Sequence, residues 1–178
     1  MDFVSKDLKR DAYVNAALPI GHDQTISQPL TVAFMLEMLD PRPGQIILDV
    51  GSGSGWTTAL LAEIVGNSGK VIAVERIKNL LDFGKDNIKK YGFVKKGVVE
   101  FYLVDGILGF PGKSPFDRIL VSASSSNIPE ELTNQMKIGG KMVIPVKNSI
   151  FYVERKRKNE FFRKEYPGFS FVPLISMK

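Results

Sequence analysis

The residues most suited to chemistry form a glycine-rich segment, DVGSGSG at positions 49–55, between an apolar run and an apolar helical pattern. Gly51, Gly53 and Gly55 allow the backbone to turn sharply and to approach a ligand where a Cβ would collide. A helix that starts after such a loop directs free backbone N–H groups toward the same place. A strand, a glycine loop and a helix in this order predict a pocket for a nucleotide-like ligand.

The spacing of the glycines decides between ligands. A dinucleotide fingerprint, G-x-G-x-x-G, would need a glycine where Trp56 stands, and the Gly-Lys-Ser/Thr of a P-loop is absent. The pattern D-x-G-x-G-x-G resembles the first motif of class I S-adenosylmethionine (SAM) methyltransferases. It therefore favours SAM.

Two acidic residues follow later strand-like runs. Glu75 comes 20 residues after Gly55, where a carboxylate can accept hydrogen bonds from both ribose hydroxyls. Asp105 ends another run and could accept from the adenine amino group. A glycine loop alone is common as a tight turn, and a single acid is common at a solvated strand end. The loop and both acids at consecutive strand ends together favour SAM binding.

The elements that must position these residues alternate along the chain. Strands are expected at 45–50, 71–75, 99–104, 117–122 and 141–146, and helices near 56–65, 77–91 and 129–137. This alternation predicts an α/β fold with a doubly wound, mostly parallel, Rossmann-like sheet that carries a C-terminal antiparallel hairpin. Ligands of such sheets bind at the carboxyl ends of the strands, where the glycine loop and both acids fall.

The 178 residues are expected to form one methyltransferase domain. It would comprise a pre-motif segment and helix (1–44), a SAM-binding core (45–146), and a C-terminal hairpin and tail (147–178). The first 26 residues are predicted to be irregular. Ser27 is expected to cap the following helix, with Pro29 in its first turn. The apolar face of that helix is expected to comprise Leu30, Ala33, Phe34, Leu36 and Leu39.

Composition excludes several classes of protein. There is no cysteine and one histidine, His22, so disulfides, thiolate catalysis and cysteine- or histidine-based metal sites are not expected. No run approaches 18 apolar residues, and the N-terminus lacks an apolar signal region. We therefore expect no metal, no membrane association and a cytoplasmic location, and we expect a monomer.

The net charge is +5, and much of it lies in the run 154–160 between two apolar-aromatic segments. This arrangement predicts the tip of a β-hairpin with Asn159 as a turn residue. A solvated tip is favoured over a nucleic-acid site, because no basic stripe is interleaved with aromatic residues.

The segment PIGHDQTISQP at 19–29 points to a substrate. It closely resembles the pre-motif segment of protein-L-isoaspartate O-methyltransferases, and the resemblance continues nearly end to end. Further matching segments are FDRILV at 116–121, LTNQMKIGGK at 132–141, VIPV at 143–146 and FVPL at 171–174. Because the resemblance begins almost at the first residue, the sequence is identified as an N-terminally short member of that family.

The resemblance implies an activity and a site. These enzymes use SAM to methylate the free α-carboxylate of isoaspartyl residues in damaged proteins. By resemblance, Ser27 is the active-site serine, and Asp105 with Gly106 contacts adenine. The residues expected to bind the cofactor are Gln24, Thr25, Ile26, Ser27, Asp49, Gly51, Ser52, Gly53, Gly55, Glu75, Asp105 and Gly106.

The predicted chemistry needs no general base, because a carboxylate with a pKa near ~4 is already ionised at neutral pH. The Ser27 hydroxyl can hold one acceptor oxygen and direct the other at the methyl group, or it can serve only as a helix cap. Two other functions stay open. One is a related methyltransferase acting on a modified peptide, a small molecule or RNA, and the other is a non-catalytic SAM-binding module.

Overall fold

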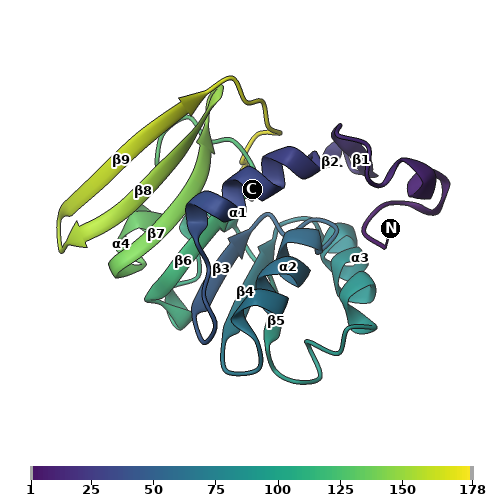
Figure 1. Ribbon diagram of the computed structural model, residues 1–178, viewed down its shortest axis with the longest axis horizontal. Coiled ribbons are helices and arrows are strands. Elements are labelled where there is room, and N and C mark those ends of the chain that lie inside the picture. The colour runs from purple at the N-terminus through teal and green to yellow at the C-terminus, as the bar shows by residue number, and fades with distance from the viewer. Residues whose placement is uncertain (1, 177–178) are drawn as a thin grey trace.

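The computed structural model describes residues 2–176. Within them, seven strands form one sheet in the order β5-β4-β3-β6-β7-β8-β9 (Figure 1). The strands are β3 (Ile46–Val50), β4 (Lys70–Glu75), β5 (Val99–Leu103), β6 (Phe116–Val121), β7 (Met136–Val146), β8 (Ser149–Arg157) and β9 (Glu160–Pro167). The pairs from β5 to β7 are parallel, whereas β8 and β9 pair antiparallel at one edge. The predicted sheet and edge hairpin are confirmed.

Helices cover both faces of this sheet. Helices α1 (Pro29–Leu39), α2 (Trp56–Val65) and α3 (Lys78–Lys89) share one core with one face, and the short α4 (Glu130–Asn134) packs on the other. Neighbouring residues of β3, such as Ile47 and Leu48, point to opposite faces and are both fully buried. Burial on both sides explains why the strands are continuous apolar runs rather than alternating ones.

The chain changes direction across the sheet at β3. From β3 it proceeds outward to β4 and β5, and then returns to the other side of β3 to form β6. Loops that leave β3 and β6 therefore diverge at their carboxyl ends and open a crevice, the usual ligand site of open α/β sheets.

The N-terminal segment is more ordered than we predicted. It contains a 3₁₀ turn (Lys6–Asp11) and a small hairpin of β1 (Leu18–Gly21) and β2 (Gln24–Ile26). His22 and Asp23 form its turn with φ of 55° and 56°, the left-handed conformation that tight hairpins favour. The expectation of an irregular segment was wrong because strands this short show no alternating pattern.

Helix α1 corrects two predictions. Its N-cap is Gln28, because Pro29 occupies the first helical position, so Ser27 does not cap it. Its buried residues are Thr31, Val32, Met35 and Leu39. Leu30 is instead 64% exposed. The predicted face was displaced because this helix is apolar nearly all round, and periodicity alone could not select the buried stripe.

The C-terminal strands are longer than predicted. β7 begins at Met136 and shortens the helix expected at 129–137, since the Phe116 N–H donates to the Gln135 carbonyl at 2.8 Å. β8 extends to Arg157 and β9 begins at Glu160. Most of the charged run at 154–160 therefore lies on these two strands rather than in the hairpin tip.

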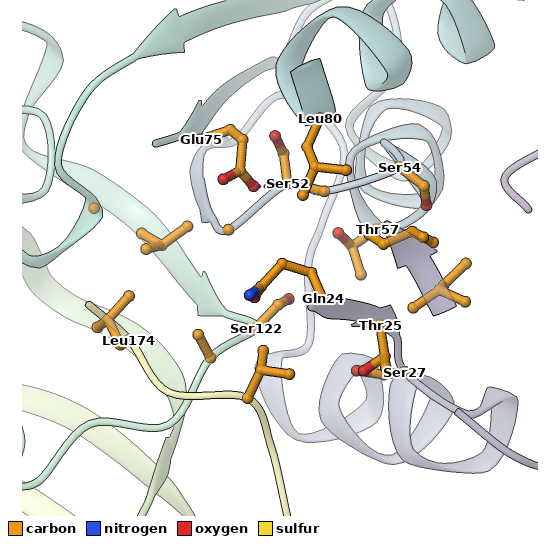
Figure 2. Close-up of a pocket in the computed structure, with 18 of the residues that line it drawn as sticks. Gln24, Thr25, Ser27, Ser52, Ser54, Thr57, Glu75, Leu80, Ser122 and Leu174 are labelled. Carbon is orange, nitrogen blue, oxygen red and sulfur yellow. Dashed lines mark hydrogen bonds between the residues drawn. The ribbon is translucent and has the colours of Figure 1, made fainter. Parts of the chain in front are cut away.

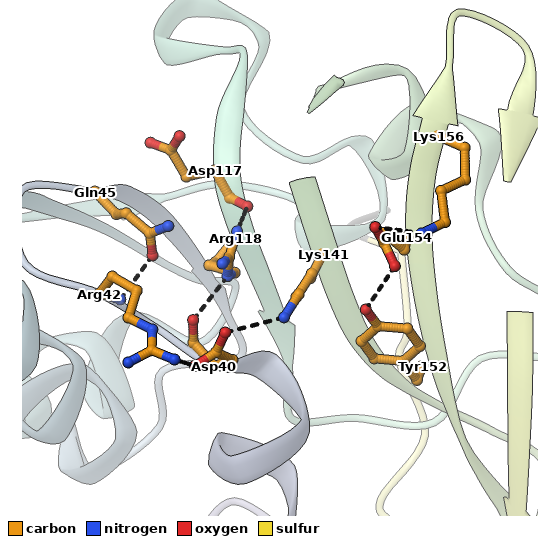
Figure 3. Close-up of polar contacts among 9 residues, drawn as sticks. All are labelled: Asp40, Arg42, Gln45, Asp117, Arg118, Lys141, Tyr152, Glu154 and Lys156. Carbon is orange, nitrogen blue, oxygen red and sulfur yellow. Dashed lines mark hydrogen bonds and ion pairs between the residues drawn. The ribbon is translucent and has the colours of Figure 1, made fainter. Parts of the chain in front are cut away.

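An ionic cluster holds the end of α1 on the sheet (Figure 3). Asp40 caps α1 in a left-handed conformation, and its carboxylate pairs with Lys141 of β7 at 3.0 Å and with Arg42 at 2.6 Å. Arg118 of β6 donates to the Asp40 carbonyl at 3.1 Å. These contacts fix α1 relative to β6 and β7, and so fix the position of its first turn.

Candidate active site

A cavity of about 770 Å³, counting its open mouth, lies over the carboxyl ends of β3, β4 and β6 (Figure 2). Segments far apart in the sequence meet there. Of the predicted site residues, those that line it are Gln24, Thr25, Ile26, Ser27, Gly51, Ser52, Gly53, Glu75 and Gly106. Asp49, Gly55 and Asp105 lie outside the lining.

The glycine loop is held between β4 and α3. The N–H groups of Gly51 and Ser52 both donate to the Val74 carbonyl, at 2.9 and 3.1 Å. On the opposite side α3 approaches very closely, so that a Cβ at Gly84 would lie 2.8 Å from the Gly53 carbonyl oxygen. A Cβ at Gly55 would in turn meet the Gly84 carbonyl oxygen at 2.9 Å. Gly55 therefore serves loop packing rather than the cavity wall.

Glu75 has a well-defined carboxylate at the cavity wall. Its Oε2 accepts from the Gly53 N–H at 3.0 Å, and its Oε1 accepts from the N–H groups of Arg76 and Ile77. The residue is 7% exposed and its side chain points into the cavity (Figure 2). An ionised carboxylate has about four lone-pair sites, so it retains acceptor capacity for neighbouring ligand hydroxyls.

Ser52 carries a polar atom that lacks a partner. Its Oγ is buried and makes no hydrogen bond within the part of the chain that the structure describes. Buried hydroxyls are almost always paired. A polar ligand in this cavity would complete the hydrogen bonding of Ser52.

Asp49 was predicted to bind the cofactor, but its side chain lies behind the loop. It is fully buried, and its Oδ2 accepts from the hydroxyls of Thr57 and Thr58 at 3.0 and 2.6 Å. Burial raises the pKa of this carboxyl to about 6, against the lowering effect of both threonine hydroxyls. Asp49 thus anchors the first turn of α2, which supports the glycine loop.

The Asp105 carboxylate also has protein partners, and its contact with adenine stays a prediction. Its Oδ1 accepts from the Ile107 N–H at 2.9 Å and caps a 3₁₀ turn (Gly106–Leu108). Gly106 does line the cavity, and a Cβ there would lie 2.6 Å from Val50 Cγ1. The aspartate therefore shapes this wall by fixing the backbone that presents Gly106.

Ser27 lies at the opposite side of the cavity from Glu75, at the junction of β2 and α1 (Figure 2). Its hydroxyl does not cap α1 and makes no hydrogen bond within residues 2–176. Two further cavities also have Ser27 in their walls, one toward the N-terminal segment and one toward residues 168–172. Ser27 therefore contributes to the walls of all three cavities.

Several lining residues were not predicted. Among them are Ile20, Leu80, Ser122 and the segment 172–175. That segment is fastened by Ser124, whose N–H donates to the Val172 carbonyl and whose carbonyl accepts from the Leu174 N–H. The FVPL match at 171–174 was the one sequence signal for it, and it specified no role. His22 is exposed and lies outside the lining.

A glycine loop after β3, a buried acid at the end of β4 and an antiparallel edge on a parallel sheet define a Rossmann-like SAM-dependent methyltransferase. Residues 1–178 match the family described as protein-L-isoaspartate(D-aspartate) O-methyltransferase (PCMT), and the chain belongs to this family.

Similar proteins and a solved structure support this family membership. The chain is 48% identical to a protein-L-isoaspartate O-methyltransferase of Methanopyrus kandleri, over 98% of this chain and 78% of that protein. It is 43% identical to the corresponding Pyrococcus horikoshii protein, over 97% and 79%. A Plasmodium falciparum structure described as a putative member, in complex with S-adenosyl-L-homocysteine, superposes with a TM-score of 0.87 at 26% identity, over 99% of this chain and 85% of that one.

Proposed function

We propose that the chain transfers the methyl group of SAM to the α-carboxylate of L-isoaspartyl residues in proteins. Membership of the family over the whole chain supports the reaction and the cofactor. The observation that carries the proposed site is the position of Ser27, which lies in the walls of this cavity and of two neighbouring cavities.

The residues present suit SAM. We infer that Glu75 accepts from the ribose hydroxyls, that the unpaired Ser52 hydroxyl bonds to the cofactor, and that Gly53 and Gly106 leave room where side chains would intrude. When bound, SAM supplies a methyl group on a positively charged sulfur, which leaves with the electron pair of the broken carbon–sulfur bond.

The protein's own residues then have to position the acceptor. The isoaspartyl carboxylate is ionised at neutral pH, so no side chain need remove a proton. The Ser27 hydroxyl can donate to one carboxylate oxygen and leave the other free to attack. Alignment of this kind contributes up to roughly 7–11 kcal/mol of barrier reduction in favourable cases.

The direct test is methyl transfer from labelled SAM to two peptides that differ only in isoaspartate or aspartate. Base-labile label on the isoaspartyl peptide alone is expected. Label on neither peptide, with SAM binding shown by calorimetry, would contradict the proposal and leave another acceptor or a non-catalytic role.

No helix of the described residues has both the length and the apolar character needed to cross a bilayer. A cytoplasmic location, a monomeric state and the absence of a nucleic-acid partner stay predictions from the sequence. Gel filtration with light scattering would test the second of these.

A further inference from the structure

A second cavity, of about 520 Å³ with its open mouth, lies beside the first. Ile26, Ser27 and Trp56 line both cavities. The far wall of the second cavity comes from the N-terminal segment and from the residues after α3. The residue proposed to orient the acceptor therefore lies in the walls of both cavities.

The wall of this second cavity is aromatic. Phe3 stacks on Tyr91 with ring centroids 6.0 Å apart and an interplanar angle of 8°. Behind the wall, Tyr91 also stacks at 5.9 Å on Phe93, which lies outside the lining. Tyr13, also in the lining, is 73% exposed, and Tyr91 is 40% exposed. Stacked rings lose little conformational freedom on binding and offer a large apolar surface to another side chain.

Among residues 2–176, the lining of this cavity contains no unpaired charge. Of its described lining residues, Asp2 alone is charged, and its carboxylate is paired with Lys90 and accepts from the Tyr91 hydroxyl. The third cavity at Ser27 differs in character, since it combines Phe169 and Phe171 with hydroxyl-bearing residues such as Thr25, Thr31 and Ser122. It therefore offers a bound side chain more hydroxyl groups than the second cavity does.

We propose that the aromatic cavity binds an apolar or aromatic side chain next to the isoaspartyl residue, so that the enzyme selects damaged sites by their neighbours. This inference rests on the proposed function. An extended chain advances about 3.3–3.6 Å per residue, so a side chain one or two residues from a carboxylate held at Ser27 can reach the adjoining cavity.

A peptide series locates the preference. An isoaspartyl residue is placed in a Gly/Ser background, and a phenylalanine is moved from two residues before it to two residues after it. We expect one position to raise kcat/KM by about tenfold over the parent, the gain that burial of such a side chain provides. Glutamate or lysine at that position should remove the gain, because the cavity has no free counter-charge.

Two variants assign the preference to this cavity. Tyr13→Ser removes part of the aromatic wall, and Ala16→Trp fills the mouth. With either variant, kcat/KM for the phenylalanine peptide should fall to the value for the parent peptide. The rate on the parent peptide and the SAM affinity should stay unchanged. Phe162→Ser, which alters an exposed aromatic residue on β9, is the matched control and should keep the preference.

The outcomes separate the inference from the function on which it rests. Equal rates for every neighbour, or a preference that survives both variants, would overturn the inference and leave the isoaspartyl activity standing. Failure to methylate any isoaspartyl peptide despite SAM binding would overturn both.

Discussion

Ser27 orients the acceptor in our proposal, so its hydroxyl should matter for turnover and little for the cofactor. Hydrogen bonds to charged groups contribute about 1.5–3 kcal/mol, which corresponds to a loss of roughly tenfold to a hundredfold in kcat for Ser27→Ala. Steady-state kinetics on an isoaspartyl peptide measure the loss, and calorimetry measures SAM affinity.

The matched control for this change is Ser68→Ala, an exposed serine in the turn between α2 and β4. It should leave both quantities unchanged. A Ser27→Ala variant that loses SAM affinity alone, with kcat intact once SAM is saturating, would show that the hydroxyl serves the cofactor instead.

Glu75 is expected to hold the ribose, and its removal should weaken SAM binding by about 1–3 kcal/mol. The same carboxylate also accepts from the Gly53, Arg76 and Ile77 N–H groups, so Glu75→Ala should lower stability as well. Calorimetry at a temperature where the variant is fully folded separates the two effects.

The control is Glu63→Ala, which removes an exposed acid on α2 and should leave SAM affinity unchanged. Unchanged SAM affinity in Glu75→Ala would show that Glu75 is not part of the site.

Asp49 should make stability depend on pH in an unusual direction. Burial raises the pKa of its carboxyl from 3.8 to about 6, so between these values the folded chain binds more protons than the unfolded chain. The contribution of Asp49 to the free energy of unfolding therefore falls as pH rises through this window, by on the order of 2–3 kcal/mol. Denaturant titrations from pH 4 to 7 should show a smaller fall in the free energy of unfolding for Asp49→Asn than for the unchanged protein. Identical profiles for the two proteins would contradict a raised pKa at Asp49.

At the scale of elements, the contact between α3 and the glycine loop depends on Gly84. An added Cβ would lie 2.8 Å from the Gly53 carbonyl oxygen, so Gly84→Ala must displace α3 or the loop. Overpacking of this kind costs about 1–3 kcal/mol of stability, and we expect SAM affinity to fall with it. Gly112→Ala is the control, because a Cβ there meets nothing within 4 Å. If Gly84→Ala left the free energy of unfolding and the SAM affinity unchanged, the glycine loop would have to move to accept the Cβ at no cost in stability.

The elements also show what local sequence can predict. The glycine loop and Glu75 were predictable because strand, turn and helix signals follow one another within a short stretch. The buried face of α1 was not, since Leu30 and Val32 are equally apolar and only packing against the sheet distinguishes them. No sequence pattern singles out Gly84, because the reason for a glycine there lies in the glycine loop against which α3 packs.

At the scale of the whole molecule, the cavity joins the two ends of the chain. Its walls include β2 near the N-terminus and residues 172–175 near the C-terminus, along with loops from the middle of the sequence. Sequence patterns specify which segments are strands and helices, but they do not state which distant loops close over one strand end. The β2 residues of the cover were therefore predicted only through the family resemblance, and the role of residues 172–175 was not predicted.

A ligand that contacts both ends of the chain should protect both of them at once. We expect SAM to slow amide hydrogen exchange in the β1–β2 hairpin and in residues 172–175 together with the glycine loop, since binding suppresses the local openings that expose these amides. The turn at Lys158 and Asn159 lies at the far end of the β8–β9 hairpin and should exchange at the same rate with and without SAM. Protection confined to the glycine loop and Glu75 would mean that the two chain ends cover the cavity without contacting the cofactor, and that the acceptor side is organised independently of SAM.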